Sequence, residues 1–169
     1  MSVAAKAVKA VAAETQSDVK TGYLEVLNRI ERLHRHLLDV IKDELDRKGQ
    51  RDVNSVQALL LFNIGDAEMT AGELRTRGHY LGSNVSYNLK KLVEAGYIHH
   101  ARSEMDRRSV RVSLTETGRS VAHMVQELFD RHTLSIEKVG EFSVEEFADI
   151  NASLQRLERF WSDQIRFRL

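Results

Sequence analysis

Six polar side chains recur along one short stretch of this chain, and their types are suited to hydrogen bonding and ion pairing. They are Ser83, Asn84, Ser86, Tyr87, Lys90 and Lys91. The apolar residues Val85, Leu89 and Leu92 recur among them at the three- and four-residue spacing of an amphipathic helix, and Gly96 is placed to end it. We therefore expect a helix, starting at residue 82 or 83, that packs its apolar face on a core and offers its polar face to a partner.

A basic turn follows this helix. Asp106, Arg107 and Arg108 directly precede an alternating apolar strand that begins at Val110. Between positions 75 and 111 there are eight Lys or Arg against three acidic residues, and the rest of the chain carries the opposite imbalance, so the net charge is zero. Positive charge gathered on a helix and a hairpin is the electrostatic footprint of a nucleic-acid binder. A basic, merely solvated face is the alternative that charge counting leaves open.

An α-helix fits the major groove of duplex DNA, and its first turn points at the base edges. Asn84 is our first candidate for reading a base, because an amide can pair bidentately with adenine. Ser86 and Tyr87 can contact bases or phosphates, while Ser83 can also cap the helix. The two lysines fall about two turns later, where phosphate contact is the expected role, although single exposed lysines are more often only solvated.

Composition limits the class of protein. The 169 residues are 42% hydrophobic and 30% charged, which is typical of a folded globular chain. There is no proline to interrupt a helix, and the absence of cysteine excludes disulfides, thiolate metal sites and thiol redox sensing. No apolar run approaches the ~20 residues that span a bilayer, and the Ala/Lys-rich start lacks the features of a secretory signal. We expect a cytoplasmic protein with no membrane partner.

The elements that must position the polar helix can be followed along the chain. We read residues 1–18 as a flexible tail or a frayed extension of the first helix. A long helix is predicted from Gly22 to Lys48, ending at Gly49. A capping box of Asn54 with Gln57 predicts a second helix that runs to Gly65.

The third helix is predicted to start at a second capping box, Thr70 with Glu73, and to stop near Gly78. With the polar helix it completes a set of three short helices joined by tight glycine-bearing turns. Such a set followed by a two-stranded hairpin is typical of a winged helix-turn-helix. The predicted class is therefore mainly α (α+β), a winged helix-turn-helix with long flanking helices.

Two long helices follow the hairpin. The first opens at Thr115, and the second is capped by Ser143 with Glu146. Each presents a long apolar stripe, and the chain offers little other apolar surface to cover it. Burial of these stripes against a second copy of the chain is therefore favoured. Packing within one chain as a monomeric bundle is the alternative. We accordingly predict a tail (1–18), a dimerisation helix (19–50), a winged helix domain (51–115) and C-terminal dimerisation helices (116–169).

Residues 57–118 resemble the MarR family of bacterial transcription regulators. The likeness rests on two strings, Gly82-Ser83-Asn84-Val85-Ser86 with the residues through Ile98, and the more specific Asp106-Arg107-Arg108 turn that continues through Leu114-Thr115 to Gly118. The long helices that flank this region occupy the positions along the chain at which members of that family have their dimer interface. The resemblance implies a homodimeric repressor or activator on a roughly palindromic operator, often with a small phenolic or lipophilic effector. We expect no cofactor.

The resemblance also suggests roles in the hairpin. Arg108 is implied as the side chain that enters the minor groove, braced by Asp106, with Arg107 nearer the backbone. The alternative is an ordinary charged turn. Two departures from the family stand out: the chain has no cysteine for a thiol-oxidation switch, and its N-terminal tail and first helix are extended.

An effector cavity is expected between the first helix, the second helix and the start of the helix after the hairpin. The candidate lining residues are His34, Leu37, Leu38, Phe62 and Met124, each of which is more simply a core residue.

Other classes of function have less support in the residues. Seven histidines invite a metal site, but His34 and His36 point to different faces of a helix, and His99 and His100 diverge on a strand. A metal-responsive regulator therefore stays an alternative, as does a winged-helix module that binds protein or RNA. No phosphate loop, nucleophile elbow or metalloprotease helix is present, so an enzyme is not expected.

Overall fold

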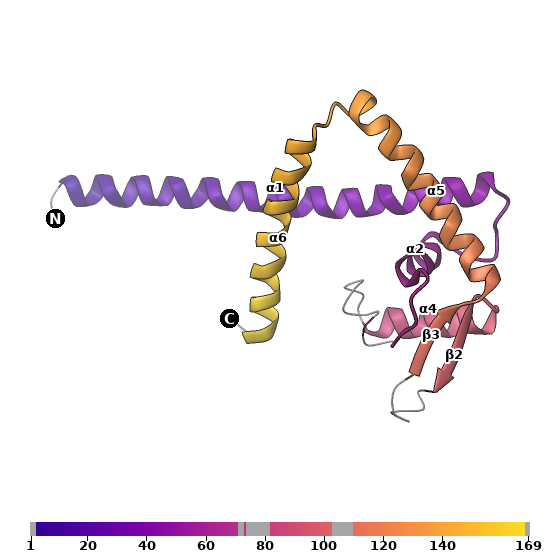
Figure 1. Ribbon diagram of the computed structural model, residues 1–169. Coiled ribbons are helices and arrows are strands. Elements are labelled where there is room, and N and C mark those ends of the chain that lie inside the picture. Colours follow the sequence, from indigo (N-terminus) through magenta and orange to yellow (C-terminus); the bar gives the residue numbers. More distant parts are fainter. Residues whose placement is uncertain (1–2, 71–72, 74–81, 103–109, 168–169) are drawn as a thin grey trace. The chain divides into compact units, whose positions relative to one another are not determined.

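The computed structural model describes residues 3–70, 73, 82–102 and 110–167 (Figure 1). The elements are α1 (Val3–Arg47), α2 (Ser55–Ile64), β1 (Met69–Thr70), α4 (Gly82–Glu94), β2 (Ile98–Arg102), β3 (Val110–Leu114), α5 (Glu116–Val139) and α6 (Val144–Phe167). The predicted class, mainly helical with a small sheet and a winged helix-turn-helix, is confirmed. The chain divides within α5 into two compact units, Met1–Val125 and Gln126–Leu169.

The first helix is longer than the predicted boundaries. α1 is a single helix of 45 residues, so the segment expected as a tail or an extension of this helix is helical from Val3 onward. Its last residue, Arg47, is one position before the predicted end at Lys48, and the predicted stop at Gly49 is present. Gly49 has φ 72°, the amide of Gln50 donates to the carbonyl of Leu45 (2.9 Å), and the amide of Gly49 donates to that of Asp46 (3.1 Å). These two bonds form a Schellman motif, in which glycine provides the left-handed backbone that stops the helix.

All three predicted capping boxes are present. In each, the first side chain accepts from the amide three residues later, and the later side chain accepts from the first amide; the pairs are Asn54 with Gln57, Thr70 with Glu73, and Ser143 with Glu146. These reciprocal bonds satisfy amides that a helix start leaves without intrahelical partners. Apart from Glu73, the predicted third helix lies outside the described residues.

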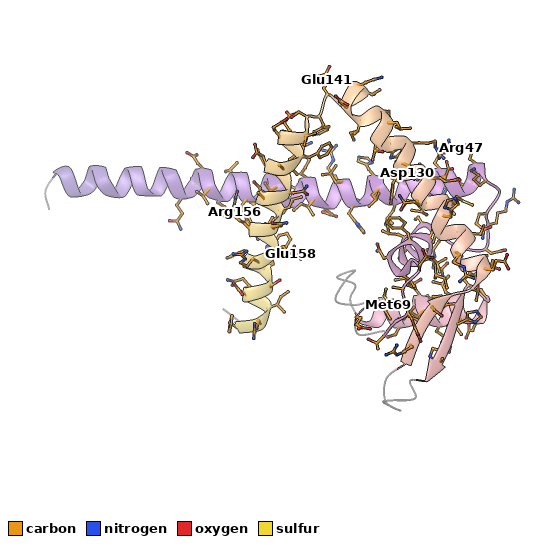
Figure 2. The ribbon with its side chains drawn as sticks, viewed as in Figure 1. Arg47, Met69, Asp130, Glu141, Arg156 and Glu158 are labelled. Atoms are coloured by element: carbon orange, nitrogen blue, oxygen red, sulfur yellow. The ribbon has the colours of Figure 1, made fainter. Side chains whose placement is uncertain are left out.

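The three strands form an antiparallel sheet in the order β1-β3-β2. Ile98 pairs with Leu114 at the base of the β2–β3 hairpin, and Arg102 pairs with Val110 at the last described rung. The predicted alternation along β3 is confirmed for the residues whose burial is described. Val112 and Leu114 are buried, whereas Arg111, the residue before Val112, is exposed. The two-residue strand β1, which begins at Met69 (Figure 2), was not predicted, since two residues are too few to show a period.

The core of the first unit draws on every long element within it. Its largest fully buried apolar side chains are Ile41, Leu60, Leu61, Ile64, Leu92, Val112 and Val125. α2 contacts both α1 and β3, and α4 contacts β2. Figure 1 shows α2, α4 and the hairpin gathered near the C-terminal end of α1. The helix with the polar face is therefore held by a core in which α1 takes part.

The second unit is different. In α6, all of which is described, no residue is buried, and the side chains spread around the helix (Figure 2, where Arg156 and Glu158 are labelled). Phe147, Ile150 and Leu154 of its predicted stripe are exposed. No described helix is both long enough and apolar enough to cross a membrane.

Candidate nucleic-acid interface

The helix α4 has the two faces that its sequence predicts. Leu92 is 1% exposed and Leu89 is 7% exposed, so both are inside the core. Ser86, Tyr87 and Lys90 are exposed, and Tyr87 keeps 63% of its surface in solvent. A large aromatic side chain this exposed contributes little to the core and is free to stack on or hydrogen bond to a partner.

The first turn of α4 includes Ser83 and Asn84, whose side chains lie outside the described part of the structure. Their backbone is helical, as predicted. The turn carries no acidic residue. Because the first amides of a helix have no intrahelical acceptors and carry partial positive charge, this end of α4 can accept an anion such as a phosphate.

The two lysines of α4 share one acid. The Nζ atom of Lys91 is 3.4 Å from Glu94 Oε2, and that of Lys90 is 3.9 Å from Glu94 Oε1. All three side chains are at least half exposed, so these pairs are worth about 0–1 kcal/mol each. Little free energy would therefore be lost if the two lysines left Glu94 to pair with phosphates.

The C-terminal end of α4 is fixed by main-chain hydrogen bonds. Gly96 has φ 77°, the amide of Tyr97 donates to the carbonyl of Leu92 (2.9 Å), and the amide of Gly96 donates to that of Val93 (3.1 Å). This is a second Schellman motif, at the glycine predicted to stop the helix. The buried ring of Tyr97 accompanies the motif and anchors the helix end in the core.

Thr115 joins this helix end to the start of α5. Its amide donates to the carbonyl of Tyr97 (3.0 Å), and its Oγ1 donates to the carbonyl of Gly96 (2.8 Å). The same oxygen accepts from the amide of Gly118 (3.1 Å), which caps α5. One threonine thus ties together the end of α4, the base of the hairpin and the first turn of α5.

The hairpin extends from this junction. Arg111, on the outward face of β3, lies 3.6 Å from Glu68 and so links the hairpin to the segment before β1. The turn residues Asp106, Arg107 and Arg108 lie outside the described residues. The structure thus describes the strands that carry this turn up to Arg102 and Val110.

A hollow of about 360 Å³ lies between α4 and the hairpin. It is lined by Ser86, Leu89, Lys90, Val93, Glu94, His100 and Val112. The lining combines the apolar side chains of Leu89, Val93 and Val112 with the charged side chains of Lys90 and Glu94. Because Ser86 and Lys90 are part of it, the hollow borders the face of α4 that bears predicted contact residues. Glu94 and His100 were not predicted to lie at this surface, because a lone acid or histidine gives no signal of its spatial neighbours.

The predicted effector residues fall into two groups. Leu38, Phe62 and Met124 are half-buried, whereas His34 and Leu37 are exposed on α1. None of these five residues lines the hollow beside α4. Their assignment to a ligand stays a prediction.

Among the residues that the structure describes, no three His, Cys, Asp or Glu side chains gather closely enough to hold a metal ion. His34, His36, His99 and His100 are all exposed.

Comparison with known proteins gives similarities for the domain that contains α4 and for most of the chain. Residues 53–118 match the winged helix DNA-binding domain family. Over 145 residues the chain is 34% identical to the exopolysaccharide II synthesis transcriptional activator ExpG of Rhizobium meliloti (strain 1021), a match that covers 86% of this chain and 74% of that protein.

Solved structures share the fold. FabT of Streptococcus pneumoniae in complex with DNA is similar with a TM-score of 0.65 and 24% identity, covering 83% of this chain and 98% of that chain. A mutant MarR from E. coli complexed with operator DNA has a TM-score of 0.65 and 20% identity, covering 80% and 95%. The transcriptional regulator SlyA has a TM-score of 0.69 and 18% identity, covering 85% and 99%.

Proposed function

Because this chain belongs to the MarR family of winged helix-turn-helix transcription regulators, we propose that it is a homodimer that binds a roughly palindromic operator and is released by a small effector. Binding to DNA and regulation of transcription follow from the family itself. The dimer, the operator symmetry, the contact residues and the effector are the parts that we propose.

The observation that supports this proposal most is the exposed polar face of α4, with Ser86, Tyr87 and Lys90, on a helix that packs against β2 of the hairpin. Ser83 and Asn84 are proposed to meet base edges, with Ser86 and Tyr87 at bases or phosphates. Lys90 and Lys91 are proposed to exchange Glu94 for phosphates. Asp106, Arg107 and Arg108 are proposed to form the tip of the wing, with Arg108 in the minor groove.

The proposed homodimer explains the apolar surface that the chain leaves exposed. Large apolar side chains are solvent-exposed on three helices, including Leu33 and Leu37 of α1, Leu134 and Val139 of α5, and Phe147, Leu154 and Phe160 of α6. Exposed apolar area on this scale marks an interaction surface, and a two-fold partner covers the same surface on both copies. Two recognition helices about one turn of DNA apart, ~34 Å, would then occupy successive major grooves.

A small phenolic or lipophilic compound is proposed as the effector, bound near His34, Leu37, Leu38, Phe62 and Met124. A ligand that prefers one separation of the recognition helices would shift the dimer away from the form that fits DNA. The relative ExpG is an activator by name, so activation is to be tested beside repression.

The central experiment selects bound fragments from the source genome with purified protein. We expect enrichment of a fragment with two inverted half-sites, bound in the presence of excess nonspecific competitor, with log affinity falling steeply as log salt rises. Light scattering on the free protein should give twice the chain mass. A strictly monomeric protein, or one that enriches no fragment in dilute buffer, would contradict the proposal.

A winged-helix module for protein or RNA is distinguished by the same experiment, because it would show no sequence preference among duplexes. Metal analysis of untagged protein tests the metal-responsive alternative, for which the described residues offer no cluster of ligands.

A further inference from the structure

We propose that Gln50 and Tyr97 form a positioning pair that fixes the angle between α1 and α4 and thereby sets the half-site spacing that the protein accepts. The inference rests on the proposed function, because spacing has meaning only for a dimer on two half-sites. Neither residue is proposed to touch DNA.

The pair is a direct side-chain hydrogen bond between residues 47 positions apart. Gln50 Nε2 donates to Tyr97 Oη at 2.8 Å in a partly buried setting. Tyr97 is 4% exposed. Because burial limits competition from water, a bond of this kind holds its two partners in one geometry better than an exposed bond does.

Both partners occupy the same place at the end of a helix. Gln50 follows Gly49 in the Schellman motif of α1, and its amide is held by Leu45. Tyr97 follows Gly96 in the Schellman motif of α4, and its amide is held by Leu92. The hydrogen bond therefore joins two helix ends that are already clamped by their own main chains. A change in the direction of α1 therefore acts on α4 through a direct side-chain contact and not through a flexible loop.

The main chain of Tyr97 adds a third element. Its carbonyl accepts from the amide of Thr115, which caps α5. Tyr97 thus connects α1 through its hydroxyl, α4 through its amide and α5 through its carbonyl. Helices α1 and α5 carry exposed apolar side chains of the proposed dimer surface, while α4 carries the proposed DNA contacts.

The geometry makes α4 sensitive to this point. Its 13 residues span about 20 Å at ~1.5 Å per residue. A rotation of about 10° around its C-terminal end would move the first turn, with Ser83 and Asn84, by roughly 3.5 Å. That displacement is close to the ~3.4 Å rise of one base pair. The end of α4 that Tyr97 holds is the pivot, and the end that meets base edges is farthest from it.

The test compares Tyr97→Phe, which removes only the hydroxyl, with Gln50→Leu and the double variant. Affinity is measured for the selected operator, for a duplex carrying one half-site, and for operators lengthened or shortened by one base pair between half-sites. We expect each single variant to weaken binding to the full operator by about five- to tenfold, since one partly buried hydrogen bond is lost. Half-site affinity should not change, and the penalty for altered spacing should shrink.

The double variant should be no weaker than either single variant, because both remove the same bond. Gln126→Leu is the matched control: Gln126 bonds Asp130 within one helix and joins no two elements, so both affinities should stay at the wild-type level.

Equal losses on full and half-sites, together with a lower Tm, would show general structural support and overturn the inference. The inference would also be overturned if both single variants bound the full operator with the affinity of the wild-type protein. If wild-type protein itself binds one half-site as tightly as two, the proposed dimeric function fails first and the inference fails with it.

Discussion

Gly118 lies against the main-chain carbonyl oxygen of Tyr97, so close that a Cβ atom built on Gly118 would overlap that oxygen. The glycine is thus required by a close approach of two backbones: the third residue of α5 packs directly on the end of α4. This contact continues the junction made by Thr115, whose Oγ1 caps the same turn.

Gly118→Ala should therefore destabilise the protein. Alanine normally favours a helix over glycine by about 1 kcal/mol, but overlap with a carbonyl oxygen forces the backbone apart at a cost of roughly 1–3 kcal/mol. Urea unfolding would measure the net loss. Gly22→Ala on α1 is the matched control, because a Cβ atom added there would meet nothing within 4 Å, and it should be neutral or stabilising. A stabilised Gly118→Ala variant would contradict the close packing.

Arg108→Ala should weaken operator binding by about 1–3 kcal/mol while leaving folding and dimerisation intact. The physical reason is the loss of a guanidinium from the negative potential of a narrow minor groove. Gel-shift titration beside a melting curve measures both properties. Arg35→Ala on α1, an exposed residue paired with Glu31, serves as the control and should bind normally. Unchanged affinity of Arg108→Ala would remove the wing tip from the mechanism.

Leu154→Glu should disrupt the proposed dimer, because it places a charge in the apolar stripe of α6. We expect dissociation into monomers to become easier by at least about 2 kcal/mol, roughly thirtyfold in the dimer Kd. Sedimentation equilibrium is the measurement. Ala152→Glu adds the same charge about 160° around the helix, at a site that is also exposed, and should leave the dimer intact. A dimer that tolerates both changes would place its interface elsewhere.

Lys90→Ala should reduce the steepness of the salt dependence. A lysine that neutralises one phosphate contributes about one unit to the slope of log affinity against log salt, independent of sequence. Titrations on the operator and on nonspecific duplex at several salt concentrations would show a parallel decrease in both. An unaltered slope would mean that this lysine stays paired with Glu94 in the complex.

Asn54→Ala should cost about 0.5–2 kcal/mol of stability, because it removes the oxygen that accepts the amide of Gln57 at 2.9 Å. The midpoint of urea unfolding reports the change. Asn28→Ala on the exposed surface of α1 is the control, where stability should change by less than about 0.5 kcal/mol. Equal stability of both variants would contradict a capping role for Asn54.

Local features were predictable from the sequence because each depends on residues no more than five positions apart. The three capping boxes, the helix stops at Gly49 and Gly96, and the alternation along β3 are of this kind. The inward positions Leu89 and Leu92 also followed from their spacing, since a helix places such residues on one face. The start of α1 was less definite, because the small residues near its N-terminus show little periodicity.

The residues by themselves determined the class of fold, the polar face of α4 and the resemblance to a family of DNA-binding regulators, because periodicity, caps and motifs act over short distances. Only the tertiary structure decided that Gln50 meets Tyr97, that Gly118 meets the carbonyl of Tyr97, and that β1 joins the sheet. These contacts depend on how elements pack across tens of residues, and no local pattern encodes the distance between two such side chains.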